Sequence, residues 1–231
     1  TQVVGRDRYT ELVCLMATIA TSLERYGTEV RNLQRSEISE VSEPFDAEKQ
    51  VGSSTMAHKR NPIQSENVTG LARVVRGFVF PTFESQVLWH ERDLSNSSTE
   101  RFTLPHVFAI LDEMFCKMNA VFSGLEVHSD RMLRNIESSK GLIMAEPVMM
   151  KLTELGFGRQ DAHEIVREAS MRAVAEDRQL RDVLLEADGL KGVVPEEEIV
   201  SVMDPANYIG GAAEIVDKMV SAVESCLDRR V

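Results

Sequence analysis

The chain has 231 residues, 43% of them hydrophobic and 27% charged, which is typical of a folded globular protein and excludes a disordered chain. Its formal net charge of −11 argues against non-specific binding to nucleic acid or to an anionic membrane surface, because both attract basic proteins. No stretch approaches the roughly 20 apolar residues of a membrane span and no signal peptide is present, so we expect a cytoplasmic protein.

The three cysteines, Cys14, Cys116 and Cys226, lie far apart in apolar-periodic stretches. None has the C-x-x-C spacing of a metal site, and an odd number does not make a disulfide framework. We therefore expect buried free thiols in a reducing compartment. We also expect no metal, flavin or nicotinamide cofactor.

A long helix is predicted over residues 6–35, where apolar residues recur at steps of three and four. Such a helix is far longer than the average of about 11 residues, which is typical of a helical bundle. The predicted buried stripe consists of Leu12, Leu15, Ile19, Leu23, Tyr26, Val30 and Leu33.

Two more long helices follow a polar segment over residues 36–58. The second is predicted to begin at Asn61-Pro62, with Asn61 as N-cap and Gln64 as capping-box partner, and to kink or end at Pro81. The third covers residues 97–126 with a heptad stripe of Phe108, Leu111, Phe115, Met118, Phe122 and Leu125.

After His128 the predicted helices become shorter and glycine and proline more frequent, ending with a helix over residues 212–227 that closes a compact domain. The predicted fold class is all-α, with part of a central helical bundle in residues 1–127 and a smaller helical domain in residues 128–231. Three long helices have too few faces to close a bundle core. We expect the missing partners to come from an upstream region removed before Thr1, from other subunits, or from both.

The chemistry-bearing stretch is G-S-S-T-M-A-H-K-R-N-P, residues 52–62. A Gly-Ser-Ser turn is followed by Lys59 and Asn61 at a helix start, so a hydroxyl, a cation, an amide and unpaired backbone N–H groups come together. That combination predicts a carboxylate site. From composition alone, a solvated loop with an ordinary helix cap is the alternative.

The same stretch closely resembles the fumarase/aspartase superfamily signature, G-S-S-x-M-P-x-K-x-N-P, and departs from it only at Ala57, where the family has Pro. The resemblance implies that Ser53 is the base that removes a proton beside a carboxylate. It implies that Lys59 and Asn61 bind this carboxylate as it becomes an aci-carboxylate dianion. Further substrate contacts are expected from Ser54, Thr55, Met56 and His58.

Two later stretches resemble adenylosuccinate lyases: residues 64–73, and the block H-E-R-D-L-S-N-S-S-T-E-R at residues 90–101. The resemblance implies that Glu66 orients the catalytic His of a neighbouring subunit, although a first-turn Glu is also favoured by the helix dipole. Two guanidinium groups and a hydroxyl at a helix start suit a phosphate. The implied nucleotide-binding residues are Arg92, Ser97 and Arg101, and Gln2 is an implied substrate contact.

The resemblance implies an elimination that converts adenylosuccinate to AMP and fumarate, and also acts on the succinyl-carboxamide ribonucleotide of purine synthesis. It implies a homotetramer whose active sites are shared between subunits, with no nucleic-acid or membrane partner. The family's general-acid His lies upstream of Thr1, so we expect this chain alone to be inactive. We expect His106, His128 and His163 to be helix-surface or core residues.

Two other functions stay open. One is a carboxymuconate cycloisomerase or another superfamily lyase acting on a non-nucleotide acid. Its distinguishing feature would be binding that needs neither a phosphate nor the pair Arg92 and Arg101. The other is a catalytically silent helical scaffold, against which the intact Ser53, Lys59 and Asn61 argue.

Overall fold

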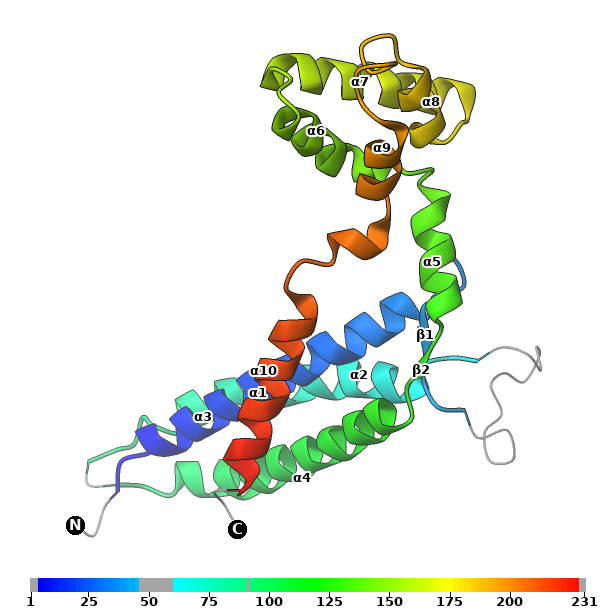
Figure 1. The fold of residues 1–231 in the computed structure, drawn as a ribbon. Coiled ribbons are helices and arrows are strands. Elements are labelled where there is room, and N and C mark those ends of the chain that lie inside the picture. Colours follow the sequence, from blue (N-terminus) through cyan, green and yellow to red (C-terminus); the bar gives the residue numbers. More distant parts are fainter. Residues whose placement is uncertain (1–3, 46–59, 91, 229–231) are drawn as a thin grey trace. The chain divides into compact units, whose positions relative to one another are not determined.

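The computed structural model describes residues 4–45, 60–90 and 92–228 (Figure 1). In these ranges the regular secondary structure is helical apart from one two-residue ladder, β1 (Val41–Ser42) antiparallel to β2 (Glu126–Val127). The predicted all-α class is confirmed. The chain divides into two compact units, Thr1–Met132 and Leu133–Val231, whereas the sequence predicted a division after residue 127.

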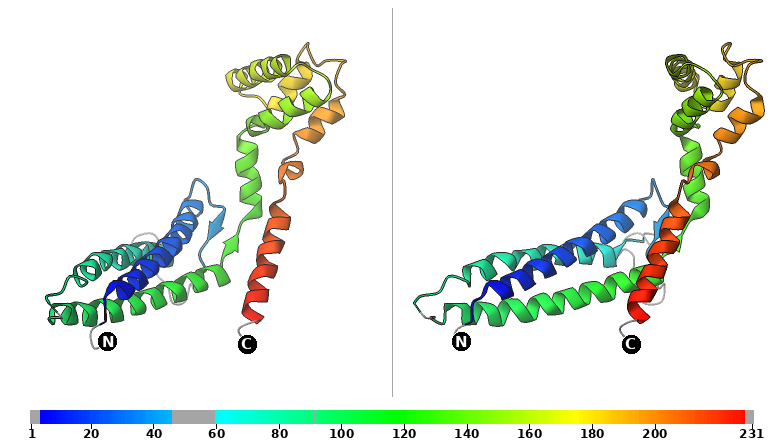
Figure 2. Two further views of the ribbon diagram at one scale, coloured as in Figure 1. Left: turned by 90° about the vertical axis from the view of Figure 1, so that its left-hand side faces the viewer. Right: turned by 60° about the vertical axis from the view of Figure 1, so that its left-hand side comes forward.

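Unit 1 is built from three long helices that lie side by side, α1 (Asp7–Leu33), α2 (Ile63–Gly77) and α4 (Ser95–Ser123) (Figures 1 and 2). The ring of Tyr26 meets that of Phe122 near one end of α1 and α4, so these two helices run parallel. Helix α2 runs antiparallel to both. The three long helices predicted from periodicity are therefore present.

The end of the second predicted helix is wrong in detail. Helix α2 stops at Gly77, and a separate short helix, α3 (Val79–Glu84), contains Pro81. Pro81 lies in the first turn of α3, where its missing N–H group costs no helical hydrogen bond. Phe78 alone separates the two helices, and Pro81 is the third residue of the new helix instead of the end of the old one.

The core of unit 1 uses a different face of α1 from the predicted stripe. Of that stripe only Leu23 and Val30 are buried, while Leu15 is 57% exposed. The buried face includes small residues, and at Gly27 the backbone of α2 comes close to α1. The buried residues of α1 are Thr10, Val13, Met16, Ala17, Ala20, Leu23, Gly27 and Val30.

The heptad stripe of α4 is likewise split. Leu111 and Met118 are buried in the core, but Phe108, Phe115 and Phe122 are 51%, 50% and 50% exposed. These three phenylalanines recur every seven residues and so lie along one face of α4. An exposed row of aromatic rings of this kind is typical of a surface that binds another protein.

Unit 2 contains most of α5 (Ser129–Ser138), then α6 (Ala145–Glu154), α7 (Arg159–Glu176), α8 (Leu180–Glu186) and α9 (Glu196–Val202). Short 3₁₀ turns at Leu142–Met144 and Pro205–Tyr208 connect some of them. Its core is formed chiefly by α6, α7, α8 and α9, with Leu152, Leu180 and Leu184 almost fully buried.

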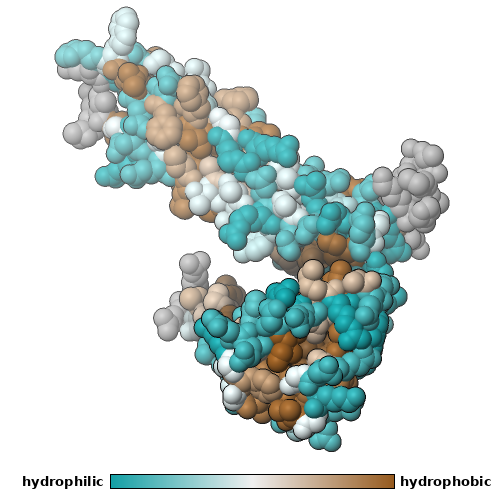
Figure 3. Space-filling model, turned by 90° about the horizontal axis from the view of Figure 1, so that it is seen from above, coloured by the Kyte–Doolittle hydropathy of each residue, from teal (hydrophilic) through white to brown (hydrophobic). Residues whose placement is uncertain are grey.

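The last helix, α10 (Ala212–Asp228), begins where it was predicted but does not close the core of unit 2, because none of its residues is buried. Hydrophobic side chains therefore reach the surface in both units, as the space-filling view also shows (Figure 3). The cysteine prediction is partly wrong: all three thiols are free, but Cys116 and Cys226 are exposed. No helix in the described ranges is long and apolar enough to cross a membrane.

Candidate active site

The predicted site residues fall into two groups. Gln2, Ser53, Ser54, Thr55, Met56, His58 and Lys59 lie outside the described residues. The structure describes Asn61, Glu66, Arg92, Ser97 and Arg101.

These five described residues do not form one cluster. Asn61 and Glu66 lie at the start of α2, beside the end of α1. The other three lie just before or within the first turns of α4. Because α1 and α4 are parallel and α2 is antiparallel, these are opposite ends of the bundle (Figure 1). Lys117 of α4 contacts Gln64 at the start of α2, so at 1.5 Å per residue about 25–30 Å of α4 separates Arg101 and Ser97 from that end.

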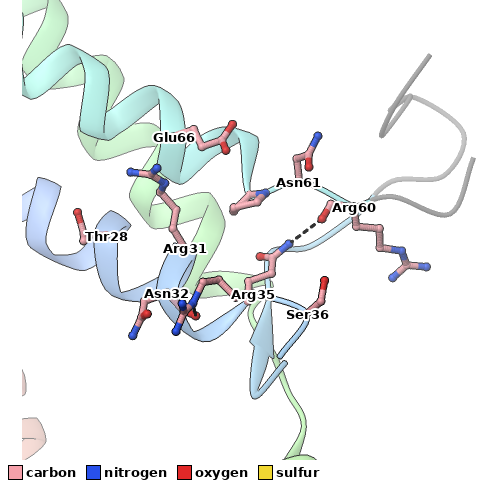
Figure 4. A pocket seen from close by; sticks show the side chains of 10 residues that line it. Thr28, Arg31, Asn32, Arg35, Ser36, Arg60, Asn61 and Glu66 are labelled. Carbon is pink, nitrogen blue, oxygen red and sulfur yellow. Dashed lines mark hydrogen bonds between the residues drawn. The ribbon is translucent and has the colours of Figure 1, made fainter. Parts of the chain in front are cut away.

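At the first end, a pocket of about 730 Å³ opens between the last turns of α1 and the start of α2 (Figure 4). Its size is within the range of small-molecule sites. It contains three guanidinium groups and one carboxylate, in a chain of net charge −11. The lining residues are Thr28, Arg31, Asn32, Gln34, Arg35, Ser36, Arg60, Asn61, Pro62 and Glu66.

The arginines of this pocket were not singled out by the sequence. Arg31 and Arg35 belong to the end of α1, where basic side chains favour the helix dipole, so their pattern gave no signal of a ligand site. Figure 4 shows Arg31 directed towards α2 and Glu66, while Arg60 points away from α1. The Arg60 guanidinium lies over the ring of Phe45, and the three guanidinium groups do not converge on one point.

The start of α2 differs from the prediction. Pro62 occupies the N-cap position and makes no side-chain cap, so Asn61 is not the cap. The cap is Glu43, whose Oε1 accepts from the backbone N–H of Ser65 at 2.7 Å and whose Oε2 accepts from that of Gln64 at 3.1 Å. These amides are already satisfied by a protein carboxylate and are not free to bind a substrate carboxylate.

The predicted capping box is also wrong. Gln64 Oε1 accepts a hydrogen bond from Lys117 Nζ at 3.0 Å, and Lys117 also pairs with Glu113 at 2.9 Å. Gln64 therefore ties the first turn of α2 to α4 instead of reaching back to Asn61. The start of α2 is held from two sides, by Glu43 and by Lys117.

At the other end of the bundle, Asp93 organises the turn that leads into α4. Its Oδ2 accepts from Trp89 N–H at 2.9 Å, and its Oδ1 accepts from Ser95 N–H at 2.7 Å and from the Ser95 hydroxyl. These hydrogen bonds, that of the Ser95 hydroxyl above all, hold the pKa of Asp93 below its ordinary value. Arg92 has a φ of 141°, which bulky residues rarely adopt. The backbone is therefore strained at a residue that is predicted to bind the nucleotide.

The beginning of α1 lies beside the same block. Arg6 Nε is 2.9 Å from Glu100 Oε1, and the Asn96 side-chain amide donates to the same oxygen at 3.0 Å. This ion pair is largely buried, so it anchors the first turn of α1 to α4. Arg92 and Arg101 themselves are exposed.

The histidines were predicted to be helix-surface or core residues. His106 and His163 are exposed on α4 and α7. His128 instead follows β2, where Nδ1 lies 3.1 Å from Ser39 O and Nε2 lies 3.3 Å from Ser42 Oγ. It fastens the ladder to the turn after α1, which sequence reasoning missed.

Residues 1–77 match the family model described as Lyase, and residues 141–219 match the model described as Adenylosuccinate lyase C-terminus. The adenylosuccinate lyase of Pyrococcus horikoshii is 51% identical over 229 residues, and that of Archaeoglobus fulgidus is 46% identical over 226. The chain belongs to the adenylosuccinate lyase family.

The chain spans about half the length of these curated relatives: the alignments cover 99% and 98% of this chain but 50% and 51% of the relatives. Among solved structures, a 3-carboxy-cis,cis-muconate lactonizing enzyme from Pseudomonas putida superposes with a TM-score of 0.84 at 33% identity, covering 94% of this chain and 47% of that one. A fumarate lyase from Mesorhizobium gives 0.82 at 29%, with the same coverage. The fold is therefore that of the fumarate lyase superfamily.

Proposed function

We propose that this chain is part of an adenylosuccinate lyase, which eliminates fumarate from adenylosuccinate to give AMP. The observation that carries the proposal is the 51% identity to a curated adenylosuccinate lyase across 99% of the chain. The lactonizing enzyme that shares the fold is only 33% identical. The succinyl-carboxamide ribonucleotide, which carries the same succinyl-amino group, is a second substrate in this proposal.

Ser53 is the proposed base that removes the proton beside the carboxylate. The resulting carbanion delocalises onto this carboxylate as an aci-carboxylate dianion, while the C–N bond to the nucleotide breaks. Lys59 and Asn61 are the proposed partners of the carboxylate, and they act where negative charge grows in the transition state. The excess of arginine over acidic residues in the lining of the pocket beside Asn61 is compatible with an anionic ligand at this end of the bundle.

The proposed phosphate ligands, Arg92, Ser97 and Arg101, lie at the opposite end of the bundle from Asn61. Along α4, Ser97 and Arg101 are about 25–30 Å from the start of α2, which contacts Lys117. One chain cannot bring both ends to one nucleotide. We therefore propose a homotetramer in which each active site combines ends of different subunits. The exposed row Phe108, Phe115 and Phe122 supports such an assembly.

A second candidate is a carboxymuconate cycloisomerase, which the likeness to the Pseudomonas putida structure favours. Its substrate carries no phosphate, so the two candidates differ in their need for Arg92 and Arg101. The cytoplasmic location stays part of the proposal, as does the inactivity of these 231 residues alone. Turnover of adenylosuccinate by a rigorously pure sample of the 231-residue chain would contradict the latter.

The test follows adenylosuccinate cleavage by ultraviolet absorbance, using the protein in the full length in which it is naturally made. Turnover that falls at least about 1,000-fold in Ser53→Ala would support both the activity and the base. Ser98→Ala, at an exposed serine of α4, is the matched control and should retain activity. A folded, tetrameric protein that turns over carboxymuconate but not adenylosuccinate would favour the second candidate.

A further inference from the structure

The described chain on the two sides of residues 46–59 is held together at one place. Gln34 Oε1 accepts from the backbone N–H of Glu43 at 2.9 Å, and Gln34 Nε2 donates to the carbonyl of Arg60 at 3.4 Å. A single side chain at the end of α1 thus holds the chain before the segment and the chain after it (Figure 4 shows the bond to Arg60).

Glu43 forms the second part of the same clamp. Its backbone is held by Gln34, and its carboxylate caps the amides of Gln64 and Ser65 at the start of α2. Glu43 is only 6% exposed, so these charge-assisted hydrogen bonds are shielded from water and correspondingly strong. The ring of Phe45 lies 4.9 Å from the Arg60 guanidinium. This contact also joins the segment before the signature to the segment after it.

A carboxylate at a helix start is stabilising in itself, but this one comes from a residue 21 and 22 positions upstream of the amides it caps. Local capping by Asn, Ser or Asp would satisfy the same amides without bridging the segment. The bridging arrangement fixes where α2 begins relative to the end of α1. Because Asn61 lies two residues before α2, its position is fixed as well.

We propose that Glu43 and Gln34 are positioning residues of the lyase reaction, which hold Asn61 and the end of the signature segment in register with the rest of the site. The inference rests on the proposed function. Neither residue touches substrate; each acts through Asn61. A displacement of about 1 Å in a group that stabilises the transition state can cost about 100-fold in rate.

The experiment uses the full-length protein and compares Glu43→Ala, Glu43→Gln and Gln34→Ala with the unmodified protein. Glu43→Ala should lower kcat by about 30- to 100-fold with KM changed by less than about 3-fold, since the loss falls on transition-state stabilisation. Glu43→Gln retains one acceptor oxygen and should recover part of the rate. Glu37→Ala, at an exposed carboxylate in the neighbouring turn, is the matched control and should behave as the unmodified protein.

A double variant separates positioning from simple stability. If Glu43 acts through Asn61, the variant Glu43→Ala, Asn61→Ala should be about as slow as Asn61→Ala alone. Rates that multiply instead, or a Glu43→Ala protein with a lower Tm but an unchanged kcat, would overturn the proposal. Gln34→Ala keeps the helix cap, so it tests the clamp if Glu43→Ala does not fold, and an unchanged kcat there would also count against it.

Failure of the proposed function looks different. An unmodified protein that is folded and tetrameric but silent on adenylosuccinate contradicts the lyase assignment, and with it the role given to Glu43. If the unmodified protein is active and the Glu43 and Gln34 variants have the same kcat, only the clamp is contradicted.

Discussion

Gly27 marks a close approach of α1 and α2. A Cβ atom at this position would lie 3.1 Å from the backbone carbonyl oxygen of Ser65, a distance that side chains in proteins rarely tolerate. The backbone N–H of Ser65 is also one of the two amide groups that Glu43 caps. The missing side chain of Gly27 thus lets α1 pack directly against the turn of α2 that follows Asn61.

The first prediction compares the same substitution at two helical glycines. Gly70→Ala, where nothing lies within 4 Å of the added methyl group, should raise the free energy of unfolding by about 0.5–1 kcal/mol, because alanine favours the helix. Gly27→Ala should lose that gain to the contact with Ser65 and be less stable than Gly70→Ala by about 1 kcal/mol or more. Denaturant unfolding measures both, and equal stabilities would show that α1 and α2 can separate without cost.

At the scale of single helices, a network of four charged side chains joins the end of α7 to the end of α8. Arg178 Nη2 lies 2.5 Å from Glu186 Oε1, and Arg172 Nη2 lies 2.6 Å from Glu186 Oε2. Both arginines also pair with Glu176. The hydrogen bond from Arg178 is the largest cause that lowers the pKa of Glu186, from 4.5 to about 2.

This shift predicts how the pairing of α7 with α8 depends on pH. The folded pKa of Glu186 is depressed, so its contribution to stability is present above pH 4.5 and is lost as the pH falls towards 2. Since the network is exposed, we expect a modest local effect that salt weakens. The protection factors of the α8 amides, which compare the observed exchange with the intrinsic rate at the same pH, should therefore decrease as the pH falls through this window.

Glu186→Gln should remove most of that acid dependence and leave α8 less protected at neutral pH. Asp188→Asn, which neutralises an exposed carboxyl group two residues further on, is the control and should follow the unmodified chain. Identical exchange profiles for Glu186→Gln and the unmodified protein would mean that the network contributes nothing measurable.

At the scale of the whole molecule, the two halves of the proposed site lie at opposite ends of unit 1. Asn61 is beside the end of α1, while Arg101 is in the second turn of α4, beside the start of α1. Two copies related by a two-fold axis across the bundle would bring unlike ends together. An active site of this kind combines the signature segment of one copy with the phosphate ligands of another.

Mixing two inactive variants tests this arrangement. Ser53→Ala disables one end and Arg101→Gln the other, so either variant alone should be slow on adenylosuccinate. After the two are unfolded and refolded together, some mixed sites receive both intact ends. For a two-copy site with random mixing, about one quarter of the unmodified activity should return. No recovery from well-formed mixed oligomers would place both ends of a site in one copy.

The sequence alone determined the features that depend on neighbouring residues. Apolar repeats predicted helices over residues 6–35 and 97–126, which the structure has as α1 and α4, because helical hydrogen bonds join residues only four apart. The string at residues 52–62 pointed to the superfamily, and the block at residues 90–101 to the adenylosuccinate lyases. Both are local patterns.

Only the tertiary structure decided which face of each helix is buried and what caps α2. Helix α1 carries apolar residues on two adjacent faces, and a repeat of 3.6 residues cannot tell the face that packs against α2 from the face that carries Leu15. Glu43 is too far upstream for any capping pattern to include it. The separation of Asn61 from Arg101 depends on how the long helices are paired. This pairing is set by contacts between residues far apart in the chain, so a short stretch of sequence does not predict it.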